Sequence, residues 1–199
     1  MLLAQPDIRE AVAAKRIVFD PPLEEEQWGP ASVDLRLGFG FTKLRRLPGF
    51  TISVAKGLGA LSGAGFWDTR TLNEHDALGK RESFFIEPGE FVLAMTYERI
   101  SVPEDLIAIV EGRSTYARVG LSMHQTAPWI QPGWNARPIV LEILNIGPNT
   151  IQLTPLTDRP CQLSFFTLST GLCAGMTYGS RSSDAYVSQE HPLDVKKKP

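Results

Sequence analysis

The stretch Ser32-Val33-Asp34-Leu35-Arg36-Leu37 decides the fold class, because its apolar and charged side chains alternate strictly. A period of two places the apolar side chains on one face of a β-strand and the charged ones on the other. The stretch therefore predicts a half-buried strand.

Short apolar runs of strand length continue through the second half of the chain, with Pro and Gly turn signals between them. They stand at residues 84–86, 91–97, 106–110, 139–146 and 162–168. Strands and helices do not alternate there, which argues against a parallel sheet. We predict a mainly β protein, an all-β barrel or double-sheet jelly roll, in which 84–86 and 91–97 form a hairpin.

Helices are few in this prediction. Pro6 and Asp7 precede Ile8, Ala11 and Val12, whose spacing places them on one face of a short N-terminal helix. A length of 199 residues fits one domain, 1–199. The glycine-rich residues 48–83 are expected to form a long insertion or arm of that domain.

Composition excludes several classes of function. Twenty Lys and Arg against 22 Asp and Glu leave a net charge of −2, so no basic field attracts nucleic acid. No apolar run reaches the roughly 20 residues of a membrane span, and the N-terminus does not resemble a signal peptide. Two cysteines and three histidines lack zinc-ligand spacing, so we expect no protein-bound metal. A cytoplasmic protein without a membrane partner is expected.

The densest group of polar side chains lies around Arg113, Ser114, Thr115 and Arg118. If Ser114 opens a short helix, its hydroxyl and the first N–H groups can donate to a phosphate, and both arginines add positive charge. The alternative is that the arginines form structural ion pairs and that Ser114 is a simple cap.

Glu142 interrupts the apolar run 139–146. An ionised carboxylate is costly in a buried strand unless it is paired, which suits a group that carries protons. The alternative is that Glu142 faces solvent or an arginine. Alternation places it on one face with Val140 and Leu144.

Several motifs together resemble those of the dCTP deaminase family, a branch of the dUTPase-like trimeric β fold (β-clip). The resemblance covers most of the chain, apart from the glycine-rich segment and the extreme C-terminus. The residues that carry it are 32–38, 87–90, 103–106, 113–121, 124–127, 132–134, 141–142 and 162–165.

The resemblance implies a homotrimer that hydrolyses dCTP to dUTP and ammonia, which feeds thymidylate synthesis. Mg²⁺ would be bound through the triphosphate, and dTTP would be a feedback inhibitor. The zinc-dependent nucleobase deaminases need a His and Cys ligand set that this sequence does not contain.

The resemblance also assigns roles to residues. Glu142 matches the general acid and base, Arg118 and Ser114 match the groups that hold the water, and Ala127 matches the carbonyl that orients the reacting groups. Residues 176–199 would form a flexible tail that closes over the nucleotide. Substrate binding would fall on Arg113, Ser114, Thr115, Arg118, Gln131, Trp134, Val140, Leu141, Tyr178 and Gln189.

Three departures from the family pattern qualify this assignment. Gln131 stands where most members have Asp, Ala185 stands where they have Lys, and one additional residue lies around 136–138. Since Gln131 cannot be a carboxylate base, deamination is favoured over dUTPase or dUMP-forming activity. The alternative from another class is a nucleotide-binding regulator with little turnover.

Overall fold

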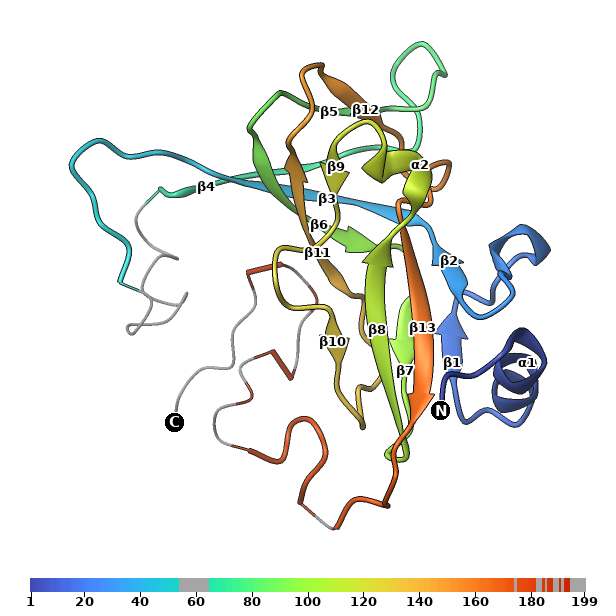
Figure 1. Ribbon diagram of the computed structural model, residues 1–199. Helices are drawn as coiled ribbons and strands as arrows, with labels where there is room; N and C mark the ends of the chain where they lie inside the picture. Colours follow the sequence, from blue (N-terminus) through green and yellow to red (C-terminus); the bar gives the residue numbers. More distant parts are fainter. Residues whose placement is uncertain are drawn as a thin grey trace.

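The computed structural model describes residues 1–53, 65–173, 175–181, 184, 186–187, 190 and 192–193. Its elements are mostly strands, and the neighbours within each sheet are antiparallel (Figure 1). This confirms the predicted mainly β fold. The helical elements are α1 (Gln5–Ala13), the 3-10 helix η1 (Glu25–Gln27) and α2 (Ser114–Ala117).

Two larger sheets and two small ones make up the strand content. One larger sheet has the order β10 (Trp129–Ile130), β8 (Leu106–Gly112), β13 (Cys161–Thr167), β2 (Val33–Leu35). The other has the order β4 (Trp67–Thr71), β3 (Leu37–Leu44), β6 (Phe91–Thr96), β11 (Val140–Asn145), β9 (Leu121–Ser122). The small sheets pair β1 (Val18–Asp20) with β7 (Arg99–Ser101), and β12 (Ile151–Leu153) with β5 (Phe84–Ile86).

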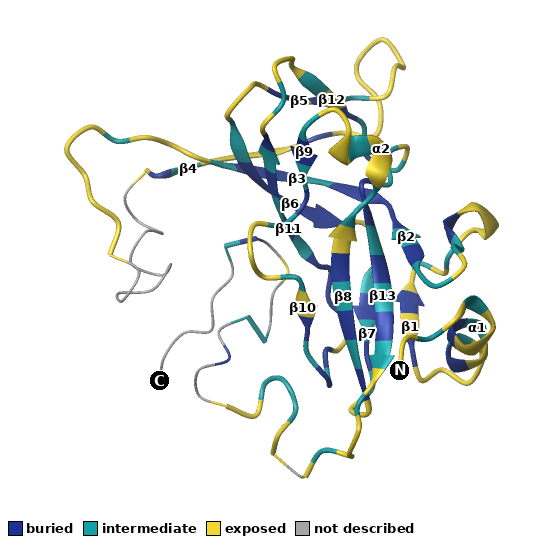
Figure 2. Ribbon diagram, in the orientation of Figure 1, coloured by how far each residue is buried: buried dark blue, intermediate teal, exposed yellow. Residues whose placement is uncertain are grey.

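The hydrophobic core draws on the inner faces of both larger sheets (Figure 2). Alternate residues of β2, β8, β11 and β13 are buried, as a period of two requires. Leu163 and Phe165 of β13 are buried together with Leu141 and Ile143 of β11. Cys161 is also buried in this core as a small apolar side chain.

Helix α1 begins close to its predicted start. Proline stands in its first turn, the Asp7 carboxylate accepts a hydrogen bond from the Ala4 N–H at 3.1 Å, and Ile8 and Ala11 are buried. The apolar face of the helix therefore packs onto the core as predicted.

The stretch 32–37 is not one strand. Val33 to Leu35 form β2 in one sheet, and Leu37 begins β3 in the other, so the chain changes sheets at Arg36. Val33, Leu35 and Leu37 are buried as the alternation predicted. The expected exposure of Arg36 is wrong, because this side chain is only 9% exposed.

Arg36 is buried because it pairs with Glu98, which has no exposed surface. Arg36 donates to the Glu98 carboxylate from Nε at 2.7 Å and from its backbone N–H at 2.9 Å. Gln27 Nε2 donates to the same carboxylate at 2.9 Å. Several hydrogen bonds thus offset the loss of hydration of both charges.

The predicted hairpin between 84–86 and 91–97 is wrong. The turn at 87–90 exists, with Glu90 N donating to Glu87 O, but β5 pairs with β12 whereas β6 pairs with β3 and β11. The buried Asn145 side chain donates to Ile86 O at 2.9 Å and to Asn149 O at 2.8 Å. This contact holds the end of β5 toward the 149–153 segment, away from β6.

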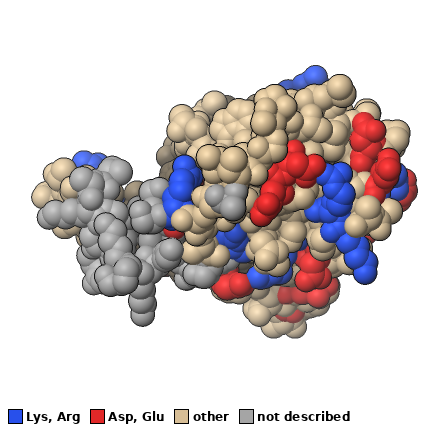
Figure 3. All heavy atoms as spheres, turned by 90° about the horizontal axis from the view of Figure 1, so that it is seen from below, with Lys and Arg blue, Asp and Glu red and all other residues tan. Residues whose placement is uncertain are grey.

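Within the glycine-rich range 48–83, strand β4 pairs with β3 along Gly40 to Leu44. Residues 54–64 of that range lie outside the described residues. None of the helices that the structure describes is long and apolar enough to cross a membrane. The face shown in Figure 3 carries acidic and basic side chains near one another, as expected for a chain of net charge −2.

Replacing Glu98 with Ala should lower the free energy of unfolding by about 3–5 kcal/mol, because Arg36 and Gln27 would lose their buried acceptor. The control is Asp68→Ala, whose exposed pair with Arg45 spans 3.1 Å and should contribute less than about 1 kcal/mol. Urea unfolding at one fixed protein concentration measures both. Equal losses in the two variants would contradict a special role for Glu98.

Candidate active site

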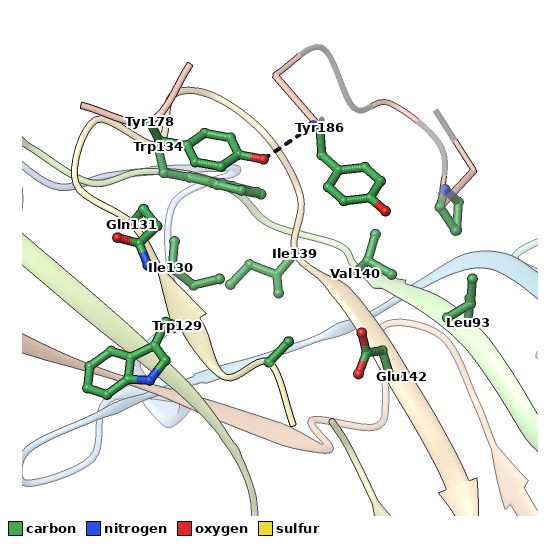
Figure 4. A pocket seen from close by; sticks show the side chains of 12 residues that line it. Leu93, Trp129, Ile130, Gln131, Trp134, Ile139, Val140, Glu142, Tyr178 and Tyr186 are labelled. Atoms are coloured by element: carbon green, nitrogen blue, oxygen red, sulfur yellow. Dashed lines mark hydrogen bonds between the residues drawn. The ribbon is translucent and has the colours of Figure 1, made fainter. Parts of the chain in front are cut away.

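A pocket lies where the turn after β10 and the start of β11 meet the C-terminal segment (Figure 4). Its walls are mainly aromatic and apolar with a few polar groups, which is typical of small-molecule sites. The lining residues are Leu93, Ala127, Trp129, Ile130, Gln131, Trp134, Ile139, Val140, Glu142, Tyr178, Tyr186 and Pro192.

Strand β11 places Glu142 in this pocket. Glu142 is opposite Leu93 of β6 in the strand register, and its neighbours Leu141 and Ile143 are fully buried on the other face. Glu142 itself is half-buried, so the expectation of a carboxylate enclosed in an apolar strand is corrected. The alternative, that Glu142 faces solvent or an arginine, is also incomplete, because the Glu142 carboxylate faces the pocket.

The segment after β9 holds Glu142 from the side. Gln125 donates twice, from its backbone N–H to Glu142 Oε2 and from Nε2 to Glu142 O, each at 3.0 Å. Glu142 N donates to Met123 O at 3.1 Å. These contacts fix the carboxylate at one oxygen, and no hydrogen bond among the described residues engages the other. No local pattern marks Gln125, because its partner Glu142 lies 17 positions further along the chain, on β11.

The turn at 131–134 provides the opposite wall. Trp134 N donates to Gln131 O at 3.2 Å, and the indole Nε1 donates to Arg137 O at 3.3 Å. Gln131, Trp134 and Val140 therefore lie in the pocket with Glu142, as the resemblance implied. The Leu141 side chain does not, since it is fully buried in the core, and only its backbone could reach a ligand.

Two tyrosines of the C-terminal segment cover the pocket. Tyr178 N donates to Pro132 O at 2.8 Å, its ring centroid lies 5.3 Å from that of Trp134, and its hydroxyl accepts from Tyr186 N at 3.3 Å. Burial is the main cause that raises the pKa of both phenols, so both remain protonated at neutral pH and can donate. Tyr186 was not predicted, and Ala185 and Gln189 lie outside the described residues.

Ser114 is the first residue of helix α2, which meets the condition set for a phosphate-binding group there. Ser114, Thr115 and Arg118 are exposed, and none of them lines the pocket. In the part of the chain that the structure describes, neither Ser114 nor Arg118 forms a hydrogen bond or ion pair with Glu142. The predicted catalytic residues thus fall in two places, with Glu142 and Ala127 at the pocket and Ser114 and Arg118 on α2.

Arg113 matches the structural alternative in part. Its Nε lies 3.0 Å from Asp34 Oδ2, and its Nη1 donates to Arg159 O at 3.0 Å. Burial raises the pKa of Asp34, and the positive charges of Arg113 and Arg159 oppose that shift. Arg113 is therefore held in place next to α2.

A second hollow lies beside α2. Gln125 lines this hollow, and its hydrogen bonds to Glu142 connect it to the first pocket. This hollow is lined by Glu111, Gly112, Ala117, Gly120, Leu121, Ser122, Met123, His124, Gln125 and Ile146. His124 Nε2 lies 3.1 Å from Glu111 Oε2. Glu142 and Ala127 thus line the first pocket, whereas Ser114 and Arg118 line neither hollow.

The fold is a β protein built around two larger sheets. Its pocket has the size and lining of a small-molecule site, and strand β11 contributes the Glu142 carboxylate to it. A family model of dCTP deaminase-like proteins matches residues 2–168. The chain belongs to the dCTP deaminase-like family.

Two relatives illustrate the similarity. A protein of Methanosphaera stadtmanae named "dCTP deaminase, dUMP-forming" is 37% identical over 96% of this chain and 91% of its own length. A protein of Rhodospirillum rubrum named "dCTP deaminase" is also 37% identical, over 97% of this chain and 95% of its own.

Among solved structures, the 2'-deoxycytidine 5'-triphosphate deaminase of Agrobacterium tumefaciens matches with a TM-score of 0.59 and 23% identity. The match covers 84% of this chain and 48% of that chain, so this chain spans about half the length of that protein. The likeness supports the fold.

Replacing Gly133 with Ala should lower the free energy of unfolding by about 1–3 kcal/mol. Gly133 has a φ of 81°, which disfavours a Cβ, and that Cβ would lie 2.8 Å from Thr177 Cβ. Gly40→Ala is the matched control, because an added Cβ there meets nothing within 4 Å. Urea unfolding of both variants tests this, and equal stability would contradict the tight approach of the C-terminal segment to the turn.

Proposed function

We propose that this chain hydrolyses the 4-amino group of dCTP and releases dUTP and ammonia. The observation that carries the proposal is the Glu142 carboxylate, which a backbone N–H fixes at one oxygen in a pocket with aromatic walls. Membership of the dCTP deaminase-like family supports the choice of substrate.

In the proposed reaction Glu142 is the general base and then the general acid. It takes a proton from water while the water oxygen forms a bond to C4 of cytosine. This proton passes to N3 of the ring. The remaining proton of the new C4 hydroxyl passes to the amino nitrogen, the C4–N bond breaks, and ammonia leaves as the C4 carbonyl forms. One water is consumed, and no electrons are transferred.

We assign the orientation of the water to Ser114, Arg118 and the Ala127 carbonyl. Ala127 lines the same pocket as Glu142, whereas Ser114 and Arg118 are exposed on α2. A second copy of the chain could bring its own α2 to this pocket, which supports the proposal of a homotrimer with sites between subunits. Exposed polar groups beside an incomplete pocket are expected of a shared site.

The triphosphate would bind Arg113, Thr115 and the C-terminal segment, with Mg²⁺ on its own oxygens. Among the described residues no group of three His, Cys, Asp or Glu lies close enough together to hold a metal ion. dTTP, another pyrimidine deoxynucleoside triphosphate, is the proposed feedback inhibitor on the strength of the family resemblance.

The second candidate function is conversion of dCTP to dUMP, because the relative from Methanosphaera stadtmanae is named dUMP-forming. Cleavage of the triphosphate requires a second base that activates water at phosphorus. Glu142 is the sole carboxylate among the described lining residues of the pocket, and Gln131 presents an amide. This composition favours dUTP as the product.

Glu142→Gln should lower the rate of ammonia release at least about 100-fold while dCTP still binds, because an amide cannot accept the proton of water. Ammonia release measures turnover, and calorimetric titration with dCTP and Mg²⁺ measures binding. The control is Glu104→Gln, a substitution of an exposed glutamate. A Glu142→Gln variant of normal rate would remove Glu142 from the reaction.

Chromatography of the wild-type product should show dUTP, and dUMP would establish the second candidate. Binding without turnover in the wild type would indicate a regulator.

Co-expressed Glu142→Gln and Arg118→Ala chains should regain activity that neither variant has alone. In mixed trimers with sites between subunits, about one site in three would combine an intact Glu142 with an intact Arg118. The measurement is ammonia release by doubly tagged, purified mixed oligomers. Inactive mixed oligomers would contradict a site shared between subunits.

A further inference from the structure

Arg137 is an unusually buried cation next to the pocket. It lies in the turn between Trp134 and β11 and is 6% exposed. Its guanidinium carbon is 4.4 Å from the Trp134 ring centroid and 5.1 Å from that of Tyr178. Within the described residues its hydrogen-bond partners are carbonyl oxygens, and it forms no ion pair with a carboxylate.

The backbone of Arg137 belongs to the body of the protein. Ile100 N donates to Arg137 O at 2.8 Å, and the Trp134 indole donates to the same oxygen at 3.3 Å. The side chain of Arg137 instead reaches the C-terminal segment, where Nη1 donates to Tyr186 O at 2.8 Å. Arg137 therefore links the β11 side of the pocket to the tail of the chain.

Charge alone does not explain this placement, because burial of a cation without a counter-ion is unfavourable. Desolvation indeed lowers the pKa of Arg137. The compensating contacts are two aromatic faces and two carbonyls, which suit a planar guanidinium better than a lysine ammonium. One aromatic face and one carbonyl, those of Tyr178 and Tyr186, depend on the tail lying over the pocket.

The contacts of Arg137 determine which groups face a ligand. Tyr178 and Tyr186 both line the pocket, and Figure 4 shows Tyr178 next to Trp134 and Tyr186 on the side of Val140 and Glu142. The Tyr186 carbonyl is bound by Arg137, and the Tyr186 N–H is bound by the Tyr178 hydroxyl. Moving Arg137 would therefore release the backbone of Tyr186 at one of these two points.

We propose that Arg137 is a positioning residue that seats the chain's own C-terminal segment on the pocket and so places the Tyr178 and Tyr186 rings against the bound nucleotide. The identity of that nucleotide rests on the proposed function, whereas the seating of the segment does not. Arg99 assists further along the tail, where its Nη1 and Nη2 contact Glu190 at 2.6 and 2.7 Å. That pair is more exposed, so Arg137 carries the larger share.

The test compares wild type with Arg137→Gln and Arg137→Lys. Hydrogen exchange followed by mass spectrometry reads the peptide that holds Tyr178 and Tyr186, and steady-state kinetics read dCTP turnover. In both variants we expect exchange of that peptide to be about tenfold faster, while β11 is unchanged. We expect KM for dCTP to rise about tenfold with kcat within about twofold, because Glu142 is untouched.

Arg70→Gln is the matched control. Arg70 is an exposed arginine of β4, which pairs with β3, and its guanidinium forms an ion pair with Glu82. Arg137→Lys keeps a cation at the site and guards against loss of the fold in Arg137→Gln. Unchanged exchange of the tail peptide in both variants would overturn the proposal, and so would equal losses in kcat with no change in KM. If wild type lacks deaminase activity, the proposed function fails, and the exchange result still decides the role of Arg137.

Discussion

The antiparallel register of β11 against β6 is the constraint on which the site depends. Glu142 is opposite Leu93 and Leu141 is opposite Ala94, so one face of β11 enters the core while the other enters the pocket. A slip of one residue would place Glu142 in the core and expose Leu141, because successive side chains point to opposite faces. The burial of Leu141 and Ile143 therefore fixes the position of the carboxylate.

A polar network connects this register to the crossing of the chain at Arg36. Glu98 binds Arg36 through its carboxylate, and its carbonyl accepts from Thr96 Oγ1 at 2.9 Å. The same Thr96 hydroxyl oxygen accepts from Ile139 N at 2.9 Å, just before β11 begins. The point where β2 passes into β3 is thus joined through buried hydrogen bonds to the strand that carries Glu142. Such networks specify one arrangement, because any alternative leaves buried polar groups unpaired.

The sequence predicted what local periodicity determines. Alternation identified the buried face of β2, and a capping-type start before apolar side chains on one helical face identified α1. In β11 alternation placed Glu142 on one face with Val140 and Leu144, but the buried face is the one that carries Leu141 and Ile143.

The sequence could not predict that Asn145 holds the end of β5, because that contact spans 59 positions. Gln125, Tyr186 and Arg137 were missed for the same reason. Each gains its role from a partner distant in the chain, and no local pattern marks it.

The residues of the candidate site reach one another by two different routes. The tail comes to the pocket within one chain, where Tyr178 N donates to Pro132 O and Arg137 binds Tyr186 O. Ser114 and Arg118 lie on α2, where they are exposed and do not line the pocket. Within one subunit the contacts of the described residues thus complete the cover of the pocket but not the set of groups expected to hold the water. A reaction that uses both the pocket residues and the groups on α2 would need contact between subunits for catalysis and Arg137 for enclosure of the pocket. Substitution of Arg118 would alter the first, and substitution of Arg137 would alter the second.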